Sequence, residues 1–134
     1  MKVTLNKFKV ISNRKGKIIK ILGKNSKNFK KFGEIYLSYV KYNSIKAWKK
    51  HSLADLNLLV IKGKVQFVFY NKNIFEKIVL TDKIKNSIFV PKKCWYGFKG
   101  LGKSENIILS ISSHLSNKKE IQRKNLKEIK FSWS

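Results

Sequence analysis

Hydrophobic and polar residues alternate between Ser44 and Asn71, and this period of two is typical of half-buried β-strands. The alternation runs through one strand ending at His51 and resumes at Leu56. It is interrupted at Lys62-Gly63-Lys64 and returns through Val65, Phe67 and Phe69. The glycine-centred interruption predicts a hairpin turn between two buried strands.

Similar short runs rich in Ile, Val, Phe and Tyr recur along the whole chain, separated by Gly or Asn. They predict strands over Phe8–Ile11, Lys17–Leu22, Glu34–Tyr42, Ile45–His51, Leu56–Lys62, Val65–Asn71, Ile74–Leu80, Ser87–Pro91, Trp95–Lys99 and Ile107–Ser113. So many strands in one domain, residues 1–134, predict an all-β fold, and an antiparallel double-sheet jelly roll closes it most economically. The mouth of such a fold is a natural pocket for a small molecule.

The C-terminal tail departs from this pattern. Ile121, Leu126 and Ile129 have the spacing that places apolar side chains on one face of a helix. A short C-terminal helix is therefore expected.

Composition narrows the class of protein. The chain of 134 residues is 43% hydrophobic, which is enough for one core, and carries a formal net charge of +24. The lysines are scattered through every segment, which favours a composition bias over a nucleic-acid-binding face. The N-terminus lacks the apolar segment of a signal peptide, no run is long enough to span a membrane, and the single cysteine, Cys94, fits a reducing compartment. A cytoplasmic protein is expected.

Two candidate chemical groups lie at the end of the strand before the hairpin. Residues two apart in a strand point to one side, so Lys49 and His51 should share one face and Lys46, Trp48 and Lys50 the other. Metal binding needs several neutral imidazoles or carboxylates around one ion. Only His51, with Asp55 nearby in sequence, offers such groups here, and we expect no bound metal or other cofactor.

Four segments carry a resemblance to a known family. "GEIYLSYVKYNSIKAWKKH", "LLVIKGKVQFVFYN", "IFVPKKCWYGF" and "ILSISSHLSNKKE" occur in the order and spacing of metal-free cupins. Lys49 and His51 stand at the H-x-H positions of the first cupin motif, and Tyr96 stands at the histidine position of the second. The chain resembles the dTDP-4-dehydrorhamnose 3,5-epimerase and dTDP-6-deoxyhex-4-ulose 3,4-ketoisomerase superfamily over nearly its whole length, which implies a jelly-roll fold.

The resemblance implies proton transfer beside the C4 ketone of a nucleotide-linked sugar, within the synthesis of surface polysaccharide sugars. Such chemistry needs a base at the carbon and a donor at the enolate oxygen. His51 is the candidate base, and Lys49 the candidate partner that holds the enolate or a pyrophosphate. If the two share a pocket, Lys49 should lower the pKa of His51 and keep it neutral. The alternatives are a solvent-exposed histidine at a strand end and a solvated surface lysine.

Candidate substrate-binding residues include several aromatic side chains. Tyr36 and Tyr39 lie on opposite faces of their strand, so one should join the core while the other lines the pocket. The remaining candidates are Lys46, Trp48, Trp95 and Tyr96; the aromatics among them either pack in the core or stack on the thymine base.

The predicted function is isomerisation or epimerisation of a nucleotide sugar, with a dTDP-linked 4-keto-6-deoxyhexose as substrate. One alternative is a homologue that binds the nucleotide sugar without catalysis, and another is a basic nucleic-acid-binding β-barrel. The resemblance also implies a homodimer, because sheet edges in this family pair between subunits.

Overall fold

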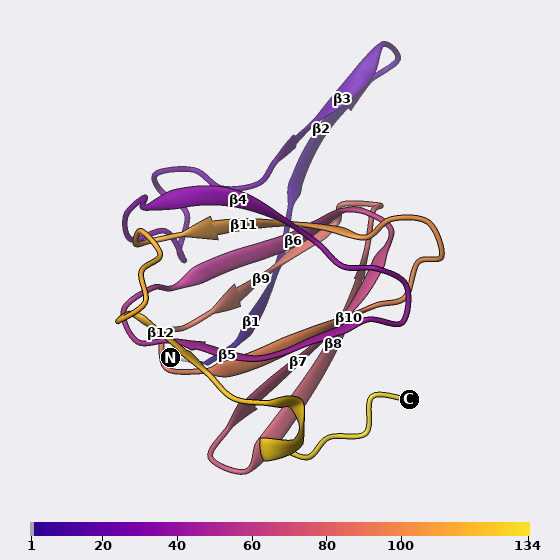
Figure 1. Cartoon of the computed structure of the whole chain (residues 1–134). Coiled ribbons are helices and arrows are strands. Elements are labelled where there is room, and N and C mark those ends of the chain that lie inside the picture. The colour runs from indigo at the N-terminus through magenta and orange to yellow at the C-terminus, as the bar shows by residue number, and fades with distance from the viewer. Residues whose placement is uncertain (1) are drawn as a thin grey trace.

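The computed structural model describes residues 2–134 and contains two five-stranded antiparallel sheets that face one another (Figure 1). The first sheet has the strand order β1-β9-β6-β11-β4 and the second the order β12-β5-β10-β7-β8. The bounds in the first sheet are β1 Thr4–Lys7, β9 Asn86–Val90, β6 Leu56–Lys62, β11 Ile107–Ser112 and β4 Glu34–Tyr39. Those in the second are β12 Ile121–Arg123, β5 Ile45–His51, β10 Trp95–Gly100, β7 Lys64–Asn71 and β8 Ile74–Thr81. The predicted antiparallel jelly roll is confirmed.

The hairpin predicted around Gly63 forms the centre of the molecule. Gly63 has φ +84°, a conformation that glycine adopts without steric cost, and it joins β6 to β7. Alternate residues of both strands, among them Leu58 and Phe67, enter one buried cluster between the two sheets. The alternate residues between them are also largely buried, so both faces of the central hairpin are covered.

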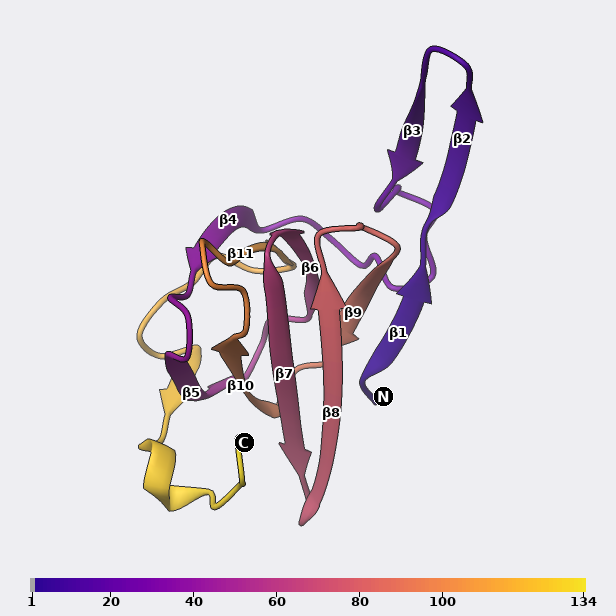
Figure 2. The same ribbon diagram turned by 90° about the vertical axis from the view of Figure 1, so that its right-hand side faces the viewer.

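The first part of the chain forms an arm that projects from the body. The expected strand Phe8–Ile11 corresponds to β2 (Lys9–Asn13), which pairs only with β3 (Gly16–Lys20), while β1, which the sequence pattern did not predict, joins the first sheet. Both views show this hairpin extending away from the two sheets (Figures 1 and 2). Val10 and Ile18 are 50% and 60% exposed there, so the apolar residues that predicted strands here are not packed in the core.

The expected C-terminal helix is wrong. Ile121 begins strand β12, which pairs with β5, and only a single 3-10 turn, Leu126–Glu128, follows. The edge of β5 offers unpaired backbone groups, and Trp48 exchanges two backbone hydrogen bonds with Lys124, at 2.9 and 3.0 Å. Pairing with this edge outweighs a weak helical spacing.

Beyond the turn, the C-terminal segment covers the outer face of the second sheet. Trp48, Val68, Ile129 and Trp133 are buried there in a second apolar cluster, which we call the outer cluster. Within residues 2–134, no helix has the length and apolar character needed to cross a membrane.

Candidate functional site

A pocket of about 580 Å³ opens between the two sheets where β4, β5 and β12 meet. Its cationic lining comes from Lys46 and Lys49 of β5 and from Arg123 and Lys124 of the C-terminal segment, and Tyr36 and Tyr96 add phenol groups. We call this the cationic pocket. Such a lining suits a ligand that carries negative charge and hydroxyl or carbonyl oxygens.

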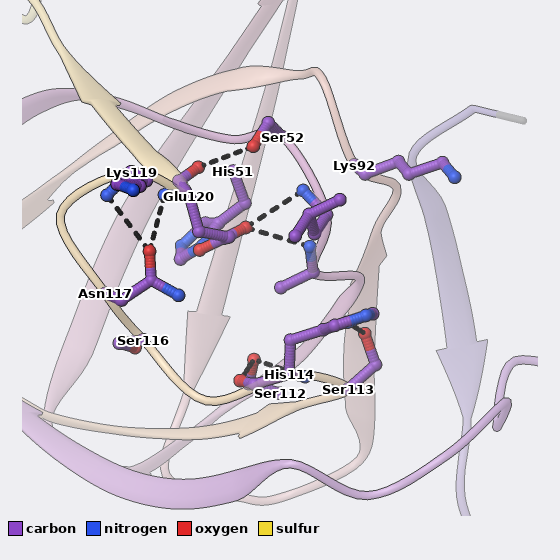
Figure 3. A network of polar contacts seen from close by, with 12 residues as sticks. His51, Ser52, Lys92, Ser112, Ser113, His114, Ser116, Asn117, Lys119 and Glu120 are labelled. Atoms are coloured by element: carbon purple, nitrogen blue, oxygen red, sulfur yellow. Dashed lines mark hydrogen bonds and ion pairs between the residues drawn. The ribbon is translucent and has the colours of Figure 1, made fainter.

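His51 ends strand β5 beside this pocket and is only 3% exposed. Its Nδ1 lies 2.7 Å from Oε2 of Glu120, and Figure 3 shows these two residues side by side. Its Nε2 lies 3.3 Å from the hydroxyl of Tyr96. A carboxylate only accepts hydrogen bonds, so Nδ1 carries the proton and Nε2 accepts from the Tyr96 hydroxyl. The imidazole is therefore held as a neutral base, with its lone pair directed at a pocket-lining phenol.

Glu120 is the partner of His51, and no pattern in the sequence singled it out. Its Oε1 accepts hydrogen bonds from the backbone N–H groups of Leu53 (3.1 Å) and Ala54 (2.9 Å), while Oε2 accepts from His51 (Figure 3). The residue directly precedes β12, whose pairing with β5 places Ile121 opposite His51. This pairing joins residues about seventy positions apart in the chain, which no local pattern reveals.

The environment lowers the pKa of both members of this His51–Glu120 pair. Burial is the main cause for His51, opposed by its hydrogen bond to Glu120, and Lys49 contributes a smaller lowering. Burial alone would raise the pKa of Glu120, but the hydrogen bonds from Ala54, His51 and Leu53 outweigh it. The expected direction for His51 is thus confirmed, although burial rather than Lys49 is the larger cause.

A bulge in β5 changes which lysines share the pocket. Lys46 pairs with Phe98 and Lys49 with Tyr96, so an extra residue of β5 lies opposite Gly97. Cross-strand partners point to the same face, and the bulge therefore brings Lys46 and Lys49 to the same side. A Cβ at residue 97 would stand 2.5 Å from that of Ala47, so the glycine admits this close approach. The expected grouping of Lys46 with Trp48 is wrong.

Burial also shifts the pKa of the groups around His51. It raises the pKa of Tyr36, and that of Tyr96 well above its ordinary value, so both phenols stay protonated. It lowers the pKa of Lys49, whose Nζ lies 6.0 Å from the centre of the Tyr36 ring. These groups form the polar floor of the pocket.

Other candidates lie elsewhere. Tyr39 is 53% exposed on the outward face of β4, so Tyr36 is the tyrosine that faces the pocket. Trp48 borders the pocket, but its ring packs on Trp133 at 5.4 Å in the outer cluster. Trp95 lies outside, between the ammonium groups of Lys50 (4.9 Å) and Lys124 (5.0 Å). The structure thus brings Tyr36, Lys46, Trp48, Lys49 and Tyr96 to the pocket, but not Tyr39 and Trp95.

Asp55 is also separated from His51. Its Oδ1 accepts a hydrogen bond from the backbone of Lys92 at 2.8 Å, and the residue lines a different hollow. Within the part of the chain that the structure describes, no group of three His, Cys, Asp or Glu side chains is arranged to hold a metal ion.

Comparison with solved structures places the fold among nucleotide-sugar enzymes. A dTDP sugar isomerase from Desulfovibrio desulfuricans G20 is 26% identical, with a TM-score of 0.88 over 98% of this chain and 90% of that one. QdtA, a sugar 3,4-ketoisomerase from Thermoanaerobacterium thermosaccharolyticum solved with TDP, is 20% identical, with a TM-score of 0.80 over 91% and 88% of the two chains.

More distantly, a dTDP-4-dehydrorhamnose 3,5-epimerase from Bacillus anthracis str. Ames, solved with TDP and PPi bound, is 14% identical, with a TM-score of 0.81 over 90% and 77% of the two chains. No family model and no curated protein matches the sequence. The resemblance to this superfamily, stated above from four segments, is confirmed at the level of structural neighbours.

Proposed function

We propose that the protein isomerises or epimerises a nucleotide-linked 4-keto sugar, with a dTDP-4-keto-6-deoxyhexose as the substrate class. The observation that carries the proposal is the buried His51, held between Glu120 and Tyr96, of which Tyr96 lines the cationic pocket. The structural neighbours supply the substrate class, since they include dTDP-sugar isomerases and epimerases.

Substrate binding is assigned to three cations of the pocket, since the Lys124 ammonium lies over the Trp95 ring outside it. A nucleoside diphosphate carries its charge on oxygens that Lys and Arg bind by charge-assisted hydrogen bonds. Lys46, Lys49 and Arg123 can meet that charge, and a volume of about 580 Å³ is within the range of sites for ligands of this size.

The proton step runs through Tyr96. His51 is covered, whereas the Tyr96 hydroxyl contacts Nε2 and lines the pocket. As the phenol oxygen takes the proton from the sugar carbon beside the ketone, the phenol passes its own proton to Nε2. The electron pair of the broken C–H bond moves into the enolate, whose oxygen the Lys49 ammonium stabilises. Return of the proton to the same carbon or to a neighbouring atom gives the product.

Glu120 orients His51 and sets its tautomer. Its hydrogen bond fixes the proton on Nδ1, and its charge stabilises the imidazolium that forms during the reaction. A neutral imidazole with a lowered pKa is the form that can accept a proton near neutral pH.

We expect dTDP to raise the melting temperature, while EDTA leaves it unchanged. Ligand that binds only the folded state adds RT ln(1 + [L]/Kd), or about 2.7 kcal/mol at a concentration near 100 Kd. Thermal-shift measurements with dTDP and thymidine test this, since thymidine lacks the charge that the cationic pocket would bind. Equal shifts with both compounds, or a stoichiometric metal in the purified protein, would contradict the assignment.

We also propose a homodimer, for which the projecting arm provides the physical reason. A two-stranded hairpin is marginal by itself in water. Here Val10 pairs with Ile19 on one face and Ile11 with Ile18 on the other, so both faces present apolar side chains. Edge strand β4 also exposes Ile35, which could receive such an arm from a second copy.

Light scattering should therefore give a dimer at high salt, with weaker association at low salt. With a net charge of +24 on each chain, repulsion between subunits grows as screening falls. Ile18→Glu should dissociate the dimer, whereas Ile74→Glu, at another exposed apolar position on β8, should not. A monomer at both salt concentrations would refute the dimer.

A further inference from the structure

A second hollow, of about 410 Å³, opens at the loop ends of the sheets. Lys30 and Lys31 line it from the segment before β4, and Lys92 and Lys93 line it from the turn between β9 and β10. We call it the loop hollow. Asp55 is the one carboxylate among the lining residues, and its Oδ1 accepts a hydrogen bond from the Lys92 backbone. Four lysines face one carboxylate, so the lining carries an excess of positive charge.

Ser113 and His114 also line this wall, where their side chains contact one another (Figure 3). The Ser113 hydroxyl is buried; it accepts from the backbone N–H of Asp55 at 2.9 Å and lies 2.9 Å from Nδ1 of His114. This contact engages Nδ1 of His114, so Nε2 is the ring nitrogen left to contact a ligand.

The walls of the loop hollow are bonded to the His51–Glu120 pair. The backbone N–H of Lys93 donates to the His51 carbonyl at 2.6 Å, and that of Leu53 donates to Oε1 of Glu120 at 3.1 Å. Leu53 and Lys93 both line the hollow. A ligand that moves the backbone at Leu53 or Lys93 therefore also changes the hydrogen bonds that these residues make to Glu120 and His51.

We propose that the loop hollow binds a phosphate group and that its occupancy is communicated to the His51–Glu120 pair. Lysines from two separate segments and the His114 imidazole line a space large enough for a phosphate dianion, which accepts several charge-assisted hydrogen bonds at once. Inorganic phosphate and a phosphate monoester share this chemistry. The inference is independent of the reaction proposed for the cationic pocket.

The two histidines of the chain allow a direct test. Proton NMR should resolve two imidazole Hε1 signals. The signal that disappears in His114→Gln belongs to His114, and the other belongs to His51. We titrate inorganic phosphate at fixed pH and constant ionic strength. The His114 signal should shift and saturate, and the His51 signal should shift with the same midpoint.

A matched pair of double variants separates a site from diffuse charge. Lys31→Gln with Lys92→Gln should weaken phosphate binding at least about tenfold, because two charge-assisted contacts are lost. Lys83→Gln with Lys85→Gln removes the same charge from the exposed turn between β8 and β9 and should leave binding unchanged. A parallel titration with glucose 6-phosphate identifies the source: tighter binding than phosphate indicates a monoester, and equal or weaker binding indicates inorganic phosphate.

Two results would overturn the proposal. A His114 shift that is absent, unsaturated or equally weakened by both double variants would show that no phosphate site exists. A saturating His114 shift without any change at His51 would refute the communication with the pair.

Discussion

Replacing His51 by Asn should slow solvent deuterium exchange into a dTDP-4-keto-6-deoxyhexose by about 10²–10⁴-fold, the usual cost of losing one general base. Asn is close in size to His but cannot accept a proton from the Tyr96 hydroxyl. Since His51 is covered by its neighbours, dTDP binding should remain, and the dTDP-induced thermal shift provides the control. Exchange in His51→Asn as fast as in the unmutated protein would exclude His51 as the base.

Tyr96→Phe extends the same experiment to the relay. The ring stays in its buried position and only the hydroxyl that contacts Nε2 is removed. Exchange should fall within the same range as for His51→Asn, and combining the two substitutions should add little, because residues that act as one unit are not additive. If the exchange rate of the double variant falls by the product of the two single factors, His51 and Tyr96 do not act in one proton path.

Glu120→Ala should destabilise the protein by about 3–5 kcal/mol, because it leaves buried donors without their acceptor at about 1–3 kcal/mol for each. Three groups lose that acceptor: the His51 imidazole and the backbone N–H groups of Leu53 and Ala54. Chemical denaturation measures the free energy of unfolding. Glu105→Ala is the matched control, since the Lys62–Glu105 pair is half exposed and should contribute no more than about 1 kcal/mol.

The pH dependence gives this comparison a second readout. The pKa of Glu120 is lowered in the folded protein, so the unfolded chain binds its proton first as the pH falls. The stabilisation by the carboxylate is fully present above the unfolded pKa of about 4.3 and is lost below it. The difference in the free energy of unfolding between the unmutated protein and Glu120→Ala should therefore become smaller as the pH falls. A difference below 1 kcal/mol at neutral pH, or one that widens in acid, would contradict the role of Glu120.

The parts of the fold that the sequence predicted correctly are those with local patterns. Strands Ile45–His51 and Leu56–Lys62 have the expected bounds because alternation and a glycine turn act over a few residues. The C-terminal tail was misassigned because its spacing fits a helix, while the competing interaction, pairing with β5, lies far away in sequence.

The site was predictable only in part for the same reason. His51 and Lys49 share a face because they are two apart in one strand, which the sequence states directly. The bulge that brings Lys46 to the side of Lys49 depends on the close approach of Gly97, in β10, to Ala47, in β5. Glu120 reaches His51 only through the β12–β5 pairing, so tertiary structure was needed to find it.

The most direct test of the proposed reaction is to incubate the unmutated protein with dTDP-4-keto-6-deoxyglucose in deuterium oxide and follow the sugar by NMR. Proton transfer beside the ketone predicts loss of the proton signal at the neighbouring carbon, dependent on enzyme concentration, whether or not a new isomer accumulates. Tyr96→Phe should show that loss at a much lower rate. If the unmutated protein binds dTDP but exchanges no proton of this or any other dTDP-linked 4-keto sugar, the catalytic account is wrong and the protein is a nucleotide-sugar-binding homologue.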